Sequence, residues 1–113
     1  MRKDDARIYD NNAIMKLLDI QPNMHLRLRQ YGDMGENAFD VYTLYKSAAK
    51  RRLTDIVEVN DVFDLRCLAW MTKKDFIEAK RLLRRLGYIT EMIDQGRPEV
   101  SYVRLVNETG RAQ

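Results

Sequence analysis

The clearest pattern of apolar and polar positions in the chain lies between Thr72 and Gly87. With successive side chains about 100° apart, five apolar residues fall on one side of a helix: Phe76, Ala79, Leu82, Leu83 and Leu86. Thr72 is a suitable N-cap, and the charge of Asp75 suits the positive end of a helix. Gly87 directly follows the apolar stripe, where helices commonly end in a left-handed residue. The pattern therefore predicts an amphipathic helix over residues 72–86.

Two segments after this helix have the composition of β-strands. Residues 88–93 and 100–106 are rich in β-branched and aromatic side chains. The intervening sequence DQGRPE, residues 94–99, is typical of turns. We therefore expect a β-hairpin with Arg97 at its tip.

The residues before the helix supply the remaining elements of a small domain. Asn60 can cap a short helix over residues 61–68, and residues 69–71 form a tight connection to the next helix. A longer helix is predicted over residues 36–52, and residues 56–59 predict a third strand beside the hairpin. The order helix, strand, helix, helix, strand, strand predicts an α+β fold with a three-helix core and a C-terminal hairpin.

This arrangement resembles a known class of DNA-binding domain. Residues 36–106 resemble winged helix-turn-helix domains, and the runs LAWMTKKDF and AKRLLRRLGYI, residues 68–76 and 79–89, are similar to those of phage, plasmid and archaeal regulators and replication-initiation proteins. In such families the recognition helix ends in a Leu-x-x-Leu-Gly-hydrophobic sequence, here LRRLGY at residues 83–88. The resemblance implies that helix 72–86 enters the major groove of double-stranded DNA and that the hairpin is the wing. It implies a transcriptional regulator or a replication-associated factor of a mobile element.

The N-terminal part is predicted to be an extension of this domain. We expect residues 1–35 to form the extension, residues 36–106 the winged helix domain and residues 107–113 a tail. Asn11 or Asn12 can cap a short helix over residues 13–20.

The rest of the extension has a different pattern. Met24–Arg29 alternates apolar and polar residues, which predicts a strand or an extended arm, and residues 31–35 suggest a turn or linker. The short helix over residues 13–20 has two alternative roles: packing on the protein's own core, or pairing with a second copy in a homodimer.

Positive charge is concentrated on the polar side of helix 72–86. Six Lys or Arg against two Asp or Glu give this segment a charge of +4, in a protein of 113 residues whose formal charge is +3. A solvated surface is the ordinary interpretation of such a helix, but the hairpin that follows favours DNA. The expected DNA-binding residues are the outward side chains of the helix and the hairpin arginine: Lys73, Lys74, Ile77, Arg81, Arg84 and Arg97. Lysine binds phosphate as readily as guanine, so DNA binding is better supported than sequence reading.

Other function classes lack the residues that they need. His25 and Cys67 are the only histidine and cysteine, so no zinc site or intramolecular disulfide is expected, and Cys67 is predicted to be a buried thiol. No phosphate-binding glycine loop or nucleophile elbow occurs, so we expect neither an enzyme nor a cofactor. The sequence shows no targeting or membrane-spanning segment, which predicts a cytoplasmic protein.

The main competing hypothesis is a winged helix that binds protein, or a structural module of a nucleoprotein complex. Residues 33–71 hold seven acidic and five basic side chains, and we expect this segment to face away from DNA. A protein interface would need large apolar residues at its centre. On the polar side of helix 72–86 only Ile77 has this character.

Overall fold

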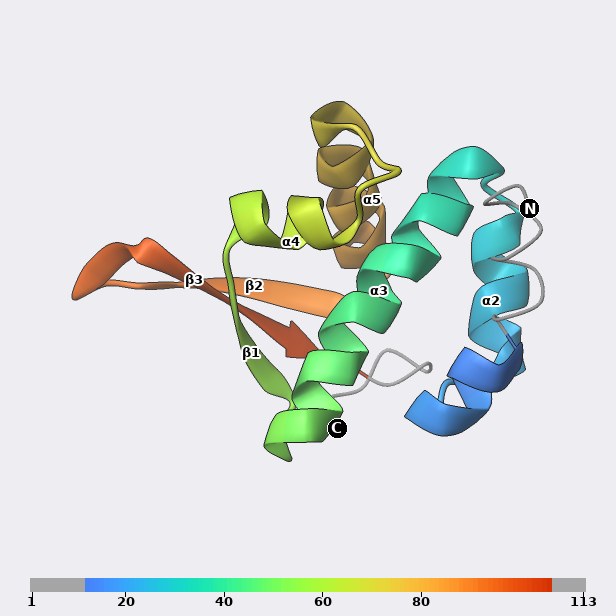
Figure 1. The fold of residues 1–113 in the computed structure, drawn as a ribbon, viewed down its shortest axis with the longest axis horizontal. Helices are drawn as coiled ribbons and strands as arrows, with labels where there is room; N and C mark the ends of the chain where they lie inside the picture. The colour runs from blue at the N-terminus through green and yellow to red at the C-terminus, as the bar shows by residue number, and fades with distance from the viewer. Residues whose placement is uncertain (1–11, 107–113) are drawn as a thin grey trace.

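A computed structural model of the protein describes residues 12–106, which form an α+β fold (Figure 1). Residues 12–18 are helical. The elements that follow are α2 (Pro22–Arg29), α3 (Asp33–Arg52), β1 (Ile56–Val59), α4 (Asp61–Cys67), α5 (Lys73–Arg85), β2 (Ile89–Asp94) and β3 (Arg97–Leu105). The predicted order of elements from the long helix onward is confirmed, and so is the α+β class. This arrangement is compatible with a winged helix.

The three strands form one antiparallel sheet in the order β1-β3-β2. Val103 in the central strand pairs with Val57 and Glu91, while its neighbour Tyr102 pairs with Glu58 and Met92. Because side chains alternate along a strand, Val103 and Tyr102 lie on opposite faces. Val103 is fully buried against the helices. Glu91 therefore belongs to the helix-facing side of the hairpin.

Helix α3 runs through the middle of the molecule and carries the largest part of the core (Figure 1). The most completely buried large side chains come from α2, α3, α5, the sheet and the connection between α5 and β2: Tyr42, Tyr45, Tyr88, Phe39, Phe76, Met24, Leu28, Leu82, Leu83, Ile89, Leu105 and Val41. The apolar stripe predicted for helix 72–86 is buried at four of its five positions, and Leu86 is partly buried. Burial of this stripe holds α5 against α3.

A tryptophan fixes the connection between α4 and α5. The indole Nε1 of Trp70 donates a hydrogen bond of 3.2 Å to Oδ2 of Asp40, a buried residue of α3. Met71 beside it is also buried. The tight connection predicted over residues 69–71 is confirmed, and it is anchored to the central helix.

The prediction of a strand or extended arm over Met24–Arg29 is wrong, because these residues belong to helix α2. Pro22 lies in the first turn, where its missing amide hydrogen costs nothing. Met24 and Leu28 are buried, while Leu26 is 56% exposed. Apolar residues at 24, 26 and 28 fit strand alternation, but the pair four residues apart also lies on one face of a helix. Contact with α3 selects the helix.

The segment predicted as a turn or linker over residues 31–35 is mostly helical. Helix α3 begins at Asp33, three residues before its predicted start at Glu36. A Cβ atom on Gly35 would lie 1.6 Å from the carbonyl oxygen of Leu28. Gly35 is thus a helical residue that lets α2 approach α3, and the glycine that marks the turn is Gly32, with φ of 66°.

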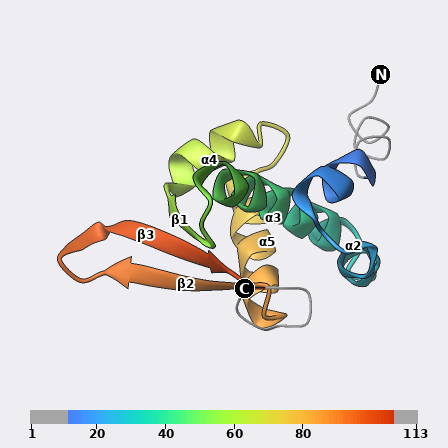
Figure 2. The same cartoon turned by 90° about the horizontal axis from the view of Figure 1, so that it is seen from below.

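The N-terminal helices pack on the protein's own core. Met15, Leu18 and Ile20 are buried in the same cluster as the side chains of α3 and the sheet. This confirms own-core packing for these side chains. Residues 12–18 and α2 lie at one end of the molecule and the β2–β3 hairpin projects from the other (Figure 2), along a longest dimension of 44 Å.

The prediction that Cys67 is buried is wrong, because its side chain is exposed. Helix α4 turns Leu65 toward the core and is followed by the buried Leu68. Cys67 lies on the other side of this short helix, as do Val62 and Phe63, which are 64% and 63% exposed.

Candidate nucleic-acid interface

Hydrogen bonds fix both ends of α5 where the sequence predicts them. Oγ1 of Thr72 accepts a hydrogen bond of 3.1 Å from the backbone amide of Asp75, as an N-cap does. At the other end the amides of Gly87 and Tyr88 donate to the carbonyl oxygens of Arg84 and Leu83, at 3.1 and 2.9 Å. With Gly87 at φ of 84°, this is a Schellman motif. The chain therefore turns directly from α5 into strand β2.

Three of the predicted DNA-binding cations of α5 are available for an external anion; the exposed Arg85 at the end of the helix, which was not predicted, also forms no ion pair within residues 12–106. Lys73, Lys74 and Arg81 are exposed, and within residues 12–106 none of them forms an ion pair. We call these three residues the free cations. Ile77, which is 43% exposed, lies on the same side of the helix.

Two other cations of α5 are held by acidic residues of the protein, and we call Lys80 and Arg84 the paired cations. Nζ of Lys80 donates a hydrogen bond of 2.8 Å to Oδ1 of Asp61 and lies 3.8 Å from Oε2 of Glu91. Nη1 of Arg84 lies 3.4 Å from Oε1 of the same glutamate. The Lys80 side chain is only 8% exposed, so its charge requires the nearby carboxylates. Two positive and two negative groups thus neutralise one another between α4, α5 and β2.

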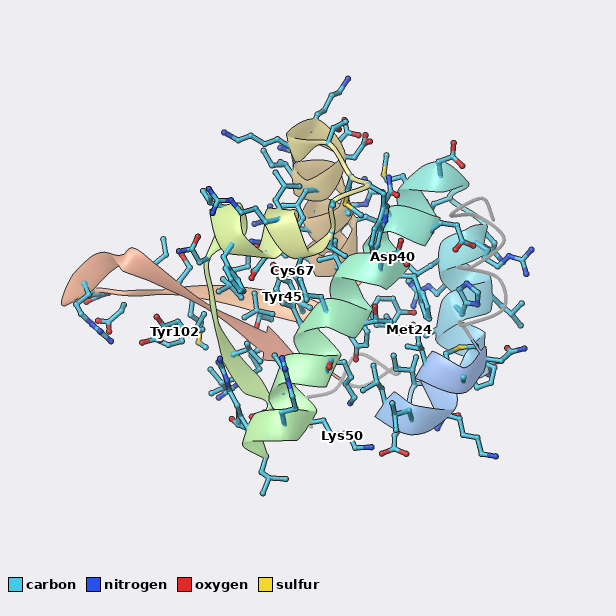
Figure 3. All side chains as sticks on the ribbon, in the orientation of Figure 1. Met24, Asp40, Tyr45, Lys50, Cys67 and Tyr102 are labelled. Atoms are coloured by element: carbon cyan, nitrogen blue, oxygen red, sulfur yellow. The ribbon has the colours of Figure 1, made fainter. Side chains whose placement is uncertain are left out.

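The paired cations adjoin a buried polar contact between α3 and α4. Figure 3 shows Tyr45 on the side of α3 that faces α4. Its hydroxyl and Oδ2 of Asp64 are buried, neither has a hydrogen-bond partner within the described residues, and each group shifts the pKa of the other. Burial raises the pKa of Tyr45, and the negative charge of Asp64 raises it further. Burial also raises the pKa of Asp64, against the lowering effects of the Tyr45 hydroxyl and of Lys80.

The tip of the hairpin carries an arginine with two partners. Arg97 Nε lies 3.6 Å from Oδ2 of Asp94, and Nη2 donates a hydrogen bond of 3.2 Å to the hydroxyl of Tyr102. Oδ1 of Asp94 accepts from the amide of Gly96 at 2.9 Å, which closes the turn. The Arg97 side chain is 59% exposed, but the tip lies far from α5 (Figures 1 and 2). The structure thus gathers five of the six predicted residues on one helix and leaves Arg97 apart.

The sequence prediction omitted Lys80 and Glu91, which limit the free positive charge of α5. Lys80 falls at the border of the apolar stripe on a helical projection, and its Nζ lies 5.7 Å from the centre of the Phe76 ring. This border position was the feature of the sequence that could have indicated a partly buried Lys80. Asp61 comes from the acidic segment that was expected to face away from DNA, and it lies against α5 because it pairs with Lys80.

Neither a metal centre nor a membrane span is found in the part of the chain that the structure describes. No three His, Cys, Asp or Glu side chains there are placed to hold a metal ion. No helix within residues 12–106 has the length and apolar character to cross a bilayer.

Comparison with known proteins identifies no relative of this chain. No protein-family model matches it, and neither a curated protein nor a solved structure shows significant similarity to it.

Proposed function

We propose that this protein binds double-stranded DNA as a winged helix, with α5 as the recognition helix and the β2–β3 hairpin as the wing. The observation that carries the proposal is the set of free cations, Lys73, Lys74 and Arg81. They extend from a rigidly capped helix that directly follows α4 and its tight connection. Exposed cations that have no internal partner can neutralise DNA phosphates.

In this proposal α5 enters the major groove with Lys73 and Lys74 near the backbone and with Ile77 and Arg81 nearer the bases. Arg97 at the wing tip contacts the backbone or the minor groove. The composition of the helix favours a firm hold on phosphate over extensive base reading. The biological role that we infer is transcriptional regulation or replication of a mobile element.

The test is fluorescence anisotropy with a labelled duplex over a range of salt concentrations. The triple variant Lys73→Ala/Lys74→Ala/Arg81→Ala should lower affinity by more than about tenfold at about 0.1 M salt. It should reduce the slope of log affinity against log salt by about 1.8, since the phosphate contacts of Lys73 and Lys74 contribute about 0.9 each. The control is Arg51→Ala/Arg52→Ala. These exposed arginines lie at the C-terminal end of α3, away from the start of α5 (Figure 1). An equal loss in the control, or no binding by the wild type, would refute the proposal.

Selection from a random duplex pool would then distinguish the forms of DNA binding. Recovery of a palindrome would indicate a homodimer that binds two half-sites. In that case we propose the N-terminal extension as the dimer interface, since Leu17 and Leu26 are 68% and 56% exposed there. Enrichment of no sequence would indicate a module that coats DNA.

A second candidate function is protein binding, and one observation favours it. Val62 and Phe63 are exposed side by side on α4. Large apolar side chains at a surface are typical of the centres of protein interfaces. This function would replace the first if the wild-type protein fails to bind duplex even at low salt.

A further inference from the structure

Glu91 lies between two cations in the C-terminal half of α5, Lys80 and Arg84. Its two carboxylate oxygens divide between two cations, with Oε1 at 3.4 Å from Arg84 Nη1 and Oε2 at 3.8 Å from Lys80 Nζ. A phosphate presents the same kind of ligand, an anion with several acceptor oxygens. A phosphate that contacts Arg84 must therefore compete with the internal ion pair between Arg84 and Glu91.

The two partners of Glu91 differ in how they would respond to its loss. Lys80 is almost fully buried and keeps its 2.8 Å hydrogen bond to Asp61. The Arg84 side chain is 53% exposed, and within the described residues Glu91 is its one acidic partner. Removing the charge of Glu91 would thus release Arg84 toward solvent and leave Lys80 in place.

We propose that Glu91 is an affinity-limiting residue of the DNA interface, an internal carboxylate that holds Arg84 and excludes phosphate from the wing side of α5. This inference rests on the proposed function and adds a regulatory element to it. On α5, phosphate binding then excludes Arg84, and the affinity for DNA stays below what the composition of the helix would allow. Weak non-specific binding allows a protein to move along DNA.

Glu58 provides a matched control for the charge of Glu91. It lies in β1 opposite Tyr102, and therefore on the other face of the sheet from Glu91, which lies opposite Val103. Figure 3 shows Tyr102 on the side of the hairpin away from α4. Glu58 is exposed. Replacing it with glutamine changes the net charge equally without releasing Arg84.

The experiment compares Glu91→Gln, Glu58→Gln and wild type in duplex binding as a function of salt. Glu91→Gln should raise affinity roughly three- to tenfold at about 0.1 M salt and steepen the salt slope by about 0.9, the value of one added phosphate contact. Glu58→Gln should change affinity by less than about twofold, because Glu58 is exposed on the other face of the sheet and salt screens its charge from the DNA.

A double-mutant cycle with Arg84→Ala separates this role from a structural one. Arg84→Ala should lower affinity by about twofold or less in the wild type, but should abolish the gain in the Glu91→Gln background. The inference would be overturned if Glu91→Gln leaves affinity and slope unchanged, if Glu58→Gln gives the same gain, or if the gain survives Arg84→Ala. A thermal melt of each variant identifies unfolding. If Glu91→Gln does not fold, Arg84→Ala alone decides, since a large loss in the wild type would show that Arg84 is already engaged with DNA.

The outcomes also distinguish this inference from the function on which it rests. If Arg81→Ala weakens binding while Glu91→Gln has no effect, the DNA interface stands and the limiting role of Glu91 falls. If neither wild type nor Glu91→Gln binds duplex, both fall together.

Discussion

The free and the paired cations of α5 belong to one helix, yet they have opposite surroundings. Lys73, Lys74 and Arg81 extend into solvent with no acidic partner in the described part of the chain. Lys80 and Arg84 are neutralised by Asp61 and Glu91 from the two flanking elements. The charge of a helix counted from its sequence therefore overstates the charge that it can offer to a ligand. Its neighbours in the fold determine how much remains.

The largest expected effect concerns the stripe that holds both sets of cations in position. Leu83→Ala should reduce the free energy of unfolding by about 2 to 5 kcal/mol, because Leu83 is fully buried and its truncation leaves a cavity. Ile77→Ala on the exposed side of the same helix should cost less than about 0.5 kcal/mol. Urea denaturation measures both. Similar losses for the two variants would mean that α5 does not bury the side that carries Leu83.

The paired and the free cations should also differ in their contribution to the free energy of unfolding. Lys80→Met should destabilise the protein by about 1 to 3 kcal/mol, because it leaves Asp61, Asp64 and Glu91 without the ammonium group among them. Lys74→Met is the matched control and should stay within about 0.5 kcal/mol. An unchanged melting temperature for Lys80→Met would contradict this role, because the fold would not depend on the ammonium group.

DNA binding should depend more on the free cations than on the paired cations, which is the reverse of their expected effects on stability. The sequence alone predicts that Arg81→Ala and Arg84→Ala both weaken binding and flatten its salt dependence. With Arg84 held by Glu91, we expect Arg81→Ala to lower affinity about five- to tenfold at about 0.1 M salt and Arg84→Ala to lower it by about twofold or less. Equal losses in an anisotropy titration would contradict the distinction.

The buried contact beside the paired cations should appear in the pH dependence of stability. Burial raises the pKa of Asp64 above its ordinary value of 3.8, so the folded state binds the proton more tightly than the unfolded state does. Stability from this group is complete below pH 3.8 and declines as pH rises through the folded pKa. Asp64→Asn removes this decline, and the variant should gain stability relative to wild type as pH rises above 3.8.

Tyr45→Phe sharpens this measurement. The Tyr45 hydroxyl lowers the pKa of Asp64, so its removal should extend the decline to higher pH. Urea denaturation at several pH values measures both variants. A difference between Asp64→Asn and wild type that does not vary with pH would contradict the assignment.

The smallest effect is expected at the wing tip. Arg97→Ala should lower DNA affinity by about twofold or less, since Asp94 and Tyr102 already engage the guanidinium. Asp94→Asn removes the competing charge and should raise affinity slightly, measured in the same titration. A loss with Arg97→Ala as large as that of Arg81→Ala would make the wing tip a principal contact.

Local chemistry made much of the fold predictable. The side chains of Thr72 and Asn60 cap α5 and α4 as expected, and Gly87 ends α5 in the left-handed conformation. These signals act within a few residues, so a sequence displays them directly. The apolar stripe of α5 was predicted for the same reason, because its spacing is a property of the helix itself.

Other features depended on contacts between distant segments. Alternation at Met24, Leu26 and Leu28 fitted a strand as well as a helix, and packing on α3 decided between them. Gly35 resembled a linker residue, but it is the place where α2 meets α3. The exposed side of α4 places Cys67 in solvent, because this short helix buries only one side.

The sequence by itself determined the order of the helices and strands from the long helix onward, and that α5 has an apolar and a basic side, whereas β3 begins at Arg97, inside the segment predicted as a turn. Only the tertiary structure decided which of the basic residues remain free. Electrostatic pairing falls off with distance in space rather than with separation along the chain. Asp61 and Glu91 are therefore partners of α5 only because the fold brings β2 and the start of α4 beside it.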